Sequence, residues 1–262
     1  MDLTVSQLKV GARLRLGSYH CNPGNTYIPI YWVKTGRDNL FITESIIDYL
    51  AFDGKEPQNA RSVDVRYFGN PDYELSNIKQ FLNSEEIEWF EKTHDADEPP
   101  ASGRTDSWDT NYQNHPGFLN GFEAFEVASL DGDVRLPHLS EIIGDSHLPL
   151  FSQKGVRPKM TAELYRSKLS RYAGYRASSF CDFCTQDIDP RYESQIVVIG
   201  RDGRPTRRYP FSGVGVRPLC KIKPDTKVAV DDNGVYIIKP FETEEEGEFC
   251  TMDEIYHYLG LR

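Results

Sequence analysis

The 262-residue chain has no long hydrophobic run, and no stretch approaches the roughly 18 apolar residues that span a membrane. Its first residues, MDLTVSQLKVGARLRL, contain an early acid and lack the apolar core of a secretory signal. These absences argue against a membrane-embedded or exported protein. We expect a cytoplasmic protein, or one packed into a virion, with no membrane partner.

Cysteine is also scarce, with five residues in the whole chain. An odd number of cysteines without a secretory signal fits reduced thiols better than a disulfide framework. The one closely spaced pair, Cys181 and Cys184, offers half the ligands of a structural zinc site, and no second such pair completes it. We therefore predict no cofactor and keep a metal site at this pair as an alternative. The further ligands available to it are Cys220, Cys250, His20 and Cys21.

Catalytic signatures are missing as well. The chain contains no G-x-S-x-G, no phosphate-binding glycine loop and no H-E-x-x-H, and its six histidines never occur at H-x-x-x-H spacing. His138 directly precedes a predicted helix, where we expect a capping or surface residue rather than a ligand. We predict no catalytic residues, and a non-enzymatic protein is the better interpretation.

What the chain does contain is enough apolar sequence for a packed core, together with an uneven distribution of charge. Hydrophobic residues make up 39% of the sequence and aromatic residues 12%, which argues against global disorder. The net charge of −10 disfavours generic nucleic-acid binding. Residues 154–223, however, hold fifteen Lys/Arg and six acids, so this segment carries +9 and the remainder −19. The segment predicts a local anion-binding surface, unless its charges are dispersed and only solvate the protein.

Periodic patterns predict a mixed α+β protein. Leu14 and Leu16 alternate with arginines, and strands at 28–32 and 40–43 are joined by turn residues. Residues 76–91 have helical spacing, with serines 76 and 84 as candidate N-caps. The other predicted elements are a long acidic loop at 91–120, a strand at 122–127, a helix beginning at 139, a helix at 161–172, a strand at 195–199 and an Asp-Gly hairpin turn at 201–204.

The C-terminal residues 226–262 are predicted to form an appendage to a main domain of residues 1–225. Residues 227–240 predict a hairpin with Asn233-Gly234 as a type I′ turn, and residues 251–261 a short closing helix. An acidic run separates the two. A segment this small cannot bury a core of its own.

Four stretches carry a resemblance to a known family. They are GARLRLGSYH at 11–20, PIYWVKTGRDNLFITES at 29–45, VRLPHLSEI at 134–142 and RRYPFSGVGVRPLCKI at 207–222. In this order they resemble a bacterial and phage domain family of unknown function, with a GVRP signature, that belongs to the C-type-lectin-like superfold. The resemblance implies an α+β fold with a mixed or antiparallel sheet, flanking helices and long loops over residues 1–225.

A second resemblance concerns YRASSFCDFCTQDIDPRY at 175–192. It is loosely similar to the cysteine-bearing strand of formylglycine-generating enzymes, which share the same superfold. Arg176 and Phe180 match the approach to that strand, and Cys181 falls near its first thiol. The family separates its two cysteines by four residues, whereas two residues separate Cys181 from Cys184. The resemblance implies a thiol- or metal-dependent enzyme as an alternative function.

We predict a non-enzymatic ligand- or partner-binding protein that uses loops and a basic Arg/Tyr-rich surface. Arginine with tyrosine gives large contact areas and planar hydrogen-bond donors, which are typical of interfaces. The expected ligand is a protein, a glycan or another anionic group, with nucleic acid less favoured. The predicted binding residues are Tyr165, Arg166, Arg171, Tyr172, Tyr175, Arg176, Arg207 and Arg208.

Two alternatives to this interpretation stay open. The tyrosine stripe at 165–175 also fits a helix whose tyrosines lie in the core and whose Arg/Lys face is solvated. An acidic phage- or mobile-element-encoded inhibitor of a host protein would instead use the −19 remainder of the chain. Arg217, which lies in an apolar run, is expected in a structural ion pair rather than at a ligand.

Overall fold

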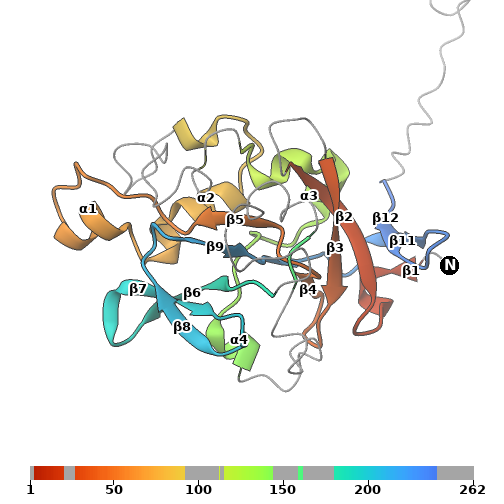
Figure 1. Ribbon diagram of the computed structural model, residues 1–262. Helices are drawn as coiled ribbons and strands as arrows, with labels where there is room; N and C mark the ends of the chain where they lie inside the picture. Colours follow the sequence, from red (N-terminus) through yellow and green to blue (C-terminus); the bar gives the residue numbers. More distant parts are fainter. Residues whose placement is uncertain are drawn as a thin grey trace, which may run out of the picture.

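Two β-sheets with short helices around them form the computed structural model, which describes residues 3–20, 27–91, 112, 115–143, 159–161 and 180–240 (Figure 1). The architecture is therefore mixed α+β and mostly sheet, as the coarse prediction had it. The larger sheet has the order β1 (Leu3–Thr4), β11 (Lys227–Val230), β12 (Tyr236–Ile238), β2 (Arg13–His20), β3 (Tyr27–Lys34), β4 (Leu40–Thr43) and β10 (Leu219–Lys221). The smaller has the order β5 (Asp48–Ala51), β9 (Gly213–Val216), β6 (Phe183–Asp189), β7 (Tyr192–Ile199) and β8 (Pro205–Arg208).

The α-helices are short, and all four lie in the sequence between β5 and β6. They are α1 (Val63–Phe68), α2 (Asn77–Leu82), α3 (Ala124–Ser129) and α4 (Leu139–Ile143), with 3₁₀ turns at Val5–Gln7, Tyr73–Leu75, Trp89–Glu91 and Phe118–Gly121. Among the described helices, none has the length and apolar character needed to cross a membrane. The predicted helices at 161–172 and 251–261, and most of the predicted loop at 91–120, lie outside the described residues.

The N-terminal strands agree with the sequence prediction. Leu14 and Leu16 are fully buried while Arg13 and Arg15 are exposed. The alternation of apolar and charged residues in the sequence therefore matches the alternation of buried and exposed side chains along the strand. Trp32 of β3 is also fully buried, and its indole Nε1 donates a hydrogen bond to the carbonyl of Leu16 at 2.9 Å. The predicted hairpin of residues 28–32 and 40–43 is confirmed by the antiparallel pairing of β3 with β4, and β2 pairs antiparallel with the other side of β3.

The predicted hairpin around residues 201–204 is also confirmed, as the antiparallel pair β7–β8. Gly203 has φ +81°, a left-handed conformation that glycine adopts without strain. Residues 196–199 are buried, as the apolar run predicts. The hairpin leaves β8 as an edge strand of the smaller sheet.

The prediction of a strand at 122–127 is wrong, because residues 124–129 form helix α3. A capping box starts it: Glu126 Oε2 accepts from the backbone of Glu123 at 2.9 Å, and the Glu123 side chain accepts from the backbone of Glu126. Phe122 is buried just before the helix, so its apolar side chain packs into the core from a loop and not from a strand.

The predicted helix over 76–91 is too long. Ser76 caps α2 as expected, accepting from the backbone of Lys79, but α2 ends at Leu82. Backbone carbonyls of residues 84 and 86 instead accept hydrogen bonds from Leu119 and Gly117, contacts with a distant segment that pull the chain out of helical geometry. Ile87, an apolar residue of the predicted helix, is consequently 65% exposed.

The predicted type I′ turn at Asn233-Gly234 is also wrong. Gly234 has φ +74°, but Asn233 is not among the described residues with positive φ, and a type I′ turn requires it at both positions. The Asp231 side chain accepts from the backbone of Asn233 and of Val235, each at 2.9 Å. This side-chain turn replaces the backbone geometry that the Asn-Gly pair favours by itself.

The C-terminal hairpin lies within the larger sheet. Strand β12 pairs in parallel with β2, and β11 pairs antiparallel with β1. Val228, Val235 and Ile238 are at most 5% exposed. The domain boundary expected at 225 therefore falls inside a continuous sheet.

Candidate functional site: the arginine edge of the smaller sheet

Of the eight predicted binding residues, two lie in the described part of the chain. Arg207 and Arg208 belong to β8, the edge strand of the smaller sheet. The remaining predicted residues all fall in the segment 162–179, outside the described residues. They are Tyr165, Arg166, Arg171, Tyr172, Tyr175 and Arg176.

Arg207 is positioned by an aromatic ring. Its guanidinium carbon lies 4.0 Å from the centroid of the Tyr192 ring, a cation–π distance. Tyr192 is 46% exposed at the start of β7, so the pair lies at the surface. Among the described residues, no carboxylate pairs with Arg207. Sequence analysis found the arginine but missed Tyr192, because the two are not adjacent in the sequence and the cross-strand partner of Arg207 is Val197.

Arg208 has a different environment. Its Nη2 lies 3.2 Å from Oδ2 of Asp182, whose side chain is only 5% exposed, whereas the Arg208 side chain is 44% exposed. Its Nη1 also lies 3.4 Å from the Arg207 carbonyl. Arg208 therefore anchors the edge strand to the sheet while part of its guanidinium stays in solvent.

A hollow of about 670 Å³ lies beside Arg207. Its walls combine apolar side chains with two arginines, the pattern of a ligand-binding surface that has an apolar floor and a few orienting polar groups. One arginine, Arg191, lies 3.7 Å from the buried Asp189 through its Nε. The lining residues are Leu139, Asp189, Pro190, Arg191, Val197, Pro205, Thr206 and Arg207.

The two cysteines of the C-x-x-C motif are both buried, and they belong to two different core clusters. Burial raises the pKa of both thiols, and the neighbouring Asp182 carboxylate raises the pKa of Cys181 further. The Cys184 thiol lies 3.4 Å from the carbonyl of Gly215. Buried thiols with raised pKa values are poor nucleophiles and poor metal ligands. Within the described residues, no group of three or more His, Cys, Asp and Glu side chains is arranged to hold a metal ion.

Arg217 and His138 each contact other residues of the fold. Arg217 is 3% exposed, its Nε donates to the carbonyl of Thr43 at 3.1 Å, and its guanidinium lies 5.6 Å from the Phe183 ring. Burial lowers the pKa of Arg217 to about 9. Because this value is still above 7, the guanidinium stays charged at neutral pH. His138 is exposed at the N-terminus of α4, with its Nδ1 3.2 Å from Asp187.

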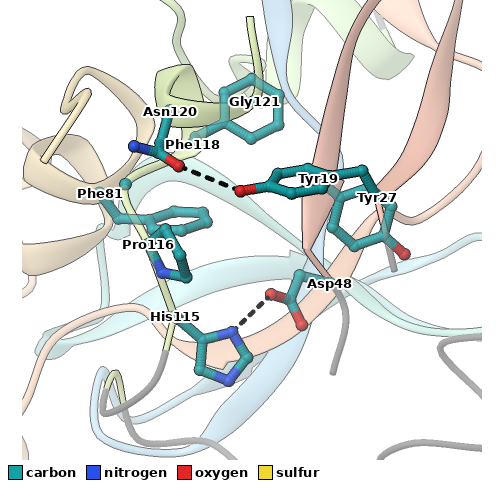
Figure 2. A pocket seen from close by; sticks show the side chains of 10 residues that line it. Tyr19, Tyr27, Asp48, Phe81, His115, Pro116, Phe118, Asn120 and Gly121 are labelled. Atoms are coloured by element: carbon teal, nitrogen blue, oxygen red, sulfur yellow. Dashed lines mark hydrogen bonds and ion pairs between the residues drawn. The ribbon is translucent and has the colours of Figure 1, made fainter. Parts of the chain in front are cut away.

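A second polar pocket lies between the two sheets, and sequence analysis did not predict it. Figure 2 shows Asp48 of β5 facing His115, with 3.4 Å between the carboxylate Oδ2 and the ring Nδ1. Asp48 is 1% exposed, and the enclosed space is about 10 Å³, room for roughly one water molecule. The pocket is thus a buried polar contact and is too small for a substrate.

The described geometry defines a two-sheet α+β protein with an arginine-bearing edge strand and an adjoining hollow. Comparison of the chain with protein-family models, curated proteins and solved structures found no match. The site is accordingly interpreted from its own residues.

Proposed function

We propose that the protein is a non-enzymatic binding protein that takes an anionic ligand at the arginine edge of the smaller sheet. The observation that carries the proposal is Arg207, held over the Tyr192 ring beside the hollow without a carboxylate partner in the described residues. A guanidinium fixed by a ring keeps its planar donors free and loses little side-chain entropy when it binds.

The charge of the surrounding sequence supports the same proposal. Residues 154–223 carry +9 in a chain whose net charge is −10. Within the span of β6 to β8, residues 183–208, five arginines stand against four acids, and β8 itself carries two arginines and no acid. A local basic surface attracts anionic groups even when the whole molecule is acidic, because salt screens more distant charges. We propose in addition that the sheets belong to the C-type-lectin-like superfold, which the GVRP-containing stretch resembles.

The proposal is tested by binding of two anionic polymers, heparin and polyglutamate, at low and at high salt. We expect binding that weakens as the salt concentration rises. Tighter binding of heparin would identify a sulfated glycan as the ligand type, and tighter binding of polyglutamate would identify an acidic protein. Arg207→Ala should weaken binding about tenfold, or ~1.4 kcal/mol.

The matched control is Arg13→Ala. Arg13 is also a strand arginine over a tyrosine ring, with its guanidinium 4.8 Å from Tyr31, but it lies on the larger sheet and pairs with Glu44 at 2.8 Å. Arg13→Ala should leave binding unchanged. Absence of binding to both polymers, or equal losses in the two variants, would overturn the proposal.

A further inference from the structure

An apolar pair of side chains is exposed on helix α1. Val63 is 58% exposed and Tyr67 is 63% exposed. Residues four apart on a helix lie on the same face, so the two form one patch. Among the large apolar side chains that the structure describes, only Ile87 is more exposed.

The helix is fixed with this face outward. The Ser62 hydroxyl oxygen accepts from the backbone of Val65 at 3.2 Å, and Gly69, with φ +78°, ends the helix. The ring of Phe68 stacks on Tyr209, with centroids 4.4 Å apart and planes inclined by 16°. These contacts prevent α1 from rotating its apolar residues toward the core, so their exposure is built into the fold.

The helix that carries the patch contacts the segment that follows the arginine edge. Tyr209 directly follows Arg208, the last residue of β8, and its ring packs on the helix that carries the patch. Figure 1 shows α1 projecting from the end of the molecule where β7 and β8 also lie. The arginine edge and α1 are thus joined through Arg208, Tyr209 and Phe68.

The charges around the patch favour an acidic partner. Arg61 is exposed, and Lys55 is half-buried with its Nζ 4.0 Å from the Phe211 ring. The exposed Arg208 is already paired with Asp182. Asp64 is an exposed acid on α1 itself. The positive charges outnumber this acid, so an apolar segment that also carries carboxylates complements the surface best.

We propose that the occupant of this surface is an acidic protein segment that places apolar side chains on Val63 and Tyr67 and carboxylates on Arg207. The proposal rests on the anionic-ligand function of the arginine edge and selects a protein segment over a glycan. Exposed tyrosines next to arginines dominate the energetics of many protein interfaces, whereas an anionic glycan has no apolar group for Val63.

Two synthetic peptides of equal length and charge test this inference, one combining Glu with Leu and the other Glu with Ser. We expect the wild-type protein to bind the Glu/Leu peptide at least tenfold more tightly. The double variant Val63→Ser/Tyr67→Ser should lose this preference and retain its affinity for the Glu/Ser peptide. Arg207→Ala should weaken the binding of both peptides.

The matched control, Ile87→Ser/Val230→Ser, removes two exposed apolar side chains elsewhere, which are 65% and 54% exposed, and should keep the preference. Equal affinity of wild type for the two peptides, or an unchanged preference in Val63→Ser/Tyr67→Ser, would overturn the inference. If heparin or polyglutamate still binds in those cases, the anionic-ligand function survives. If no anionic probe binds, both proposals fail together.

Discussion

At the scale of single residues, Gly215 shows why the GVRP-containing stretch has glycine where a strand usually has a side chain. A Cβ at this position would lie 2.4 Å from the backbone carbonyl of Asp182 and 3.1 Å from Ile46. The backbone of Gly215 donates to that same carbonyl at 3.1 Å, so strands β9 and β6 approach too closely for any side chain.

We expect Gly215→Ala to lower the free energy of unfolding by at least about 2 kcal/mol, because the backbone atoms it meets cannot move aside. Thermal unfolding followed by circular dichroism measures the loss. Gly11→Ala is the comparison, since no atom lies within 4 Å of its new Cβ and only the left-handed φ of +84° is strained. Equal losses in the two variants would mean that the close approach of β6 and β9 is unimportant.

The buried thiols give a second prediction at this scale. Cys181, Cys184 and Cys220 are at most 1% exposed, and burial raises the pKa of each. We expect none of the three to react with iodoacetamide in the folded protein and all three to react after unfolding, as read by peptide mass spectrometry. Rapid labelling of Cys181 or Cys184 in the native protein would revive the thiol-dependent enzyme as a function.

At the scale of elements, α4 is tied to the preceding segment by an ion pair with two hydrogen bonds. Arg135 Nη1 and Nη2 lie 2.8 and 2.7 Å from the two carboxylate oxygens of Glu141. Burial acts to raise the pKa of Glu141, but hydrogen bonds from Arg135 and from the backbone of His138 outweigh it and hold the pKa below its ordinary value. The folded protein therefore favours the charged carboxylate.

Because the folded-state pKa of Glu141 is depressed, its stabilising contribution is complete above the unfolded pKa of about 4.3 and is lost as the pH falls through the folded value. We expect Glu141→Gln to lower the free energy of unfolding at pH 7 by about 2 kcal/mol. The difference from wild type should shrink as the pH is lowered toward about 3. Melting curves of both proteins across this range measure it.

The surface pair Glu74–Lys79 supplies the control for this series. The Glu74 side chain is 66% exposed, so Glu74→Gln should change stability by less than about 0.5 kcal/mol at any pH. A pH-independent effect of Glu141→Gln would show that packing, and not the charge of the carboxylate, holds α4.

At the scale of the whole molecule, the larger sheet unites the two ends of the described chain. Strand β1 pairs with β11, and β12 fills the position between β11 and β2. Removal of this hairpin would expose the edge of β2 and uncover apolar residues of the core.

We expect truncation after Asp225 to cost about 5 kcal/mol or more, because Val228, Val235 and Ile238 are almost fully buried and each contributes roughly 1.5–3 kcal/mol. Truncation after Pro240, which keeps both strands, is the control. The two proteins are compared by denaturant unfolding. If they are equally stable, residues 226–240 are an appendage, as the sequence alone suggested.

The sequence by itself determined the elements that depend on local chemistry. Strands β2, β3 and β4, the β7–β8 hairpin, the Ser76 cap and α4 follow from alternation, turn residues and capping, which act over a few positions. The strand predicted at 122–127 failed because a local capping box between Glu123 and Glu126 starts a helix there. The long helix predicted at 76–91 failed because contacts with a distant segment outweigh local propensity.

Only the tertiary structure decided which residues act together. It placed Tyr192 under Arg207, paired β12 with β2, buried Cys181 and Cys184 in separate clusters and left Val63 and Tyr67 outside the core. Each of these outcomes depends on packing between different segments of the chain. Sequence periodicity indicates which face of an element is apolar, but not which other element packs against that face. The candidate site depends on such contacts between elements.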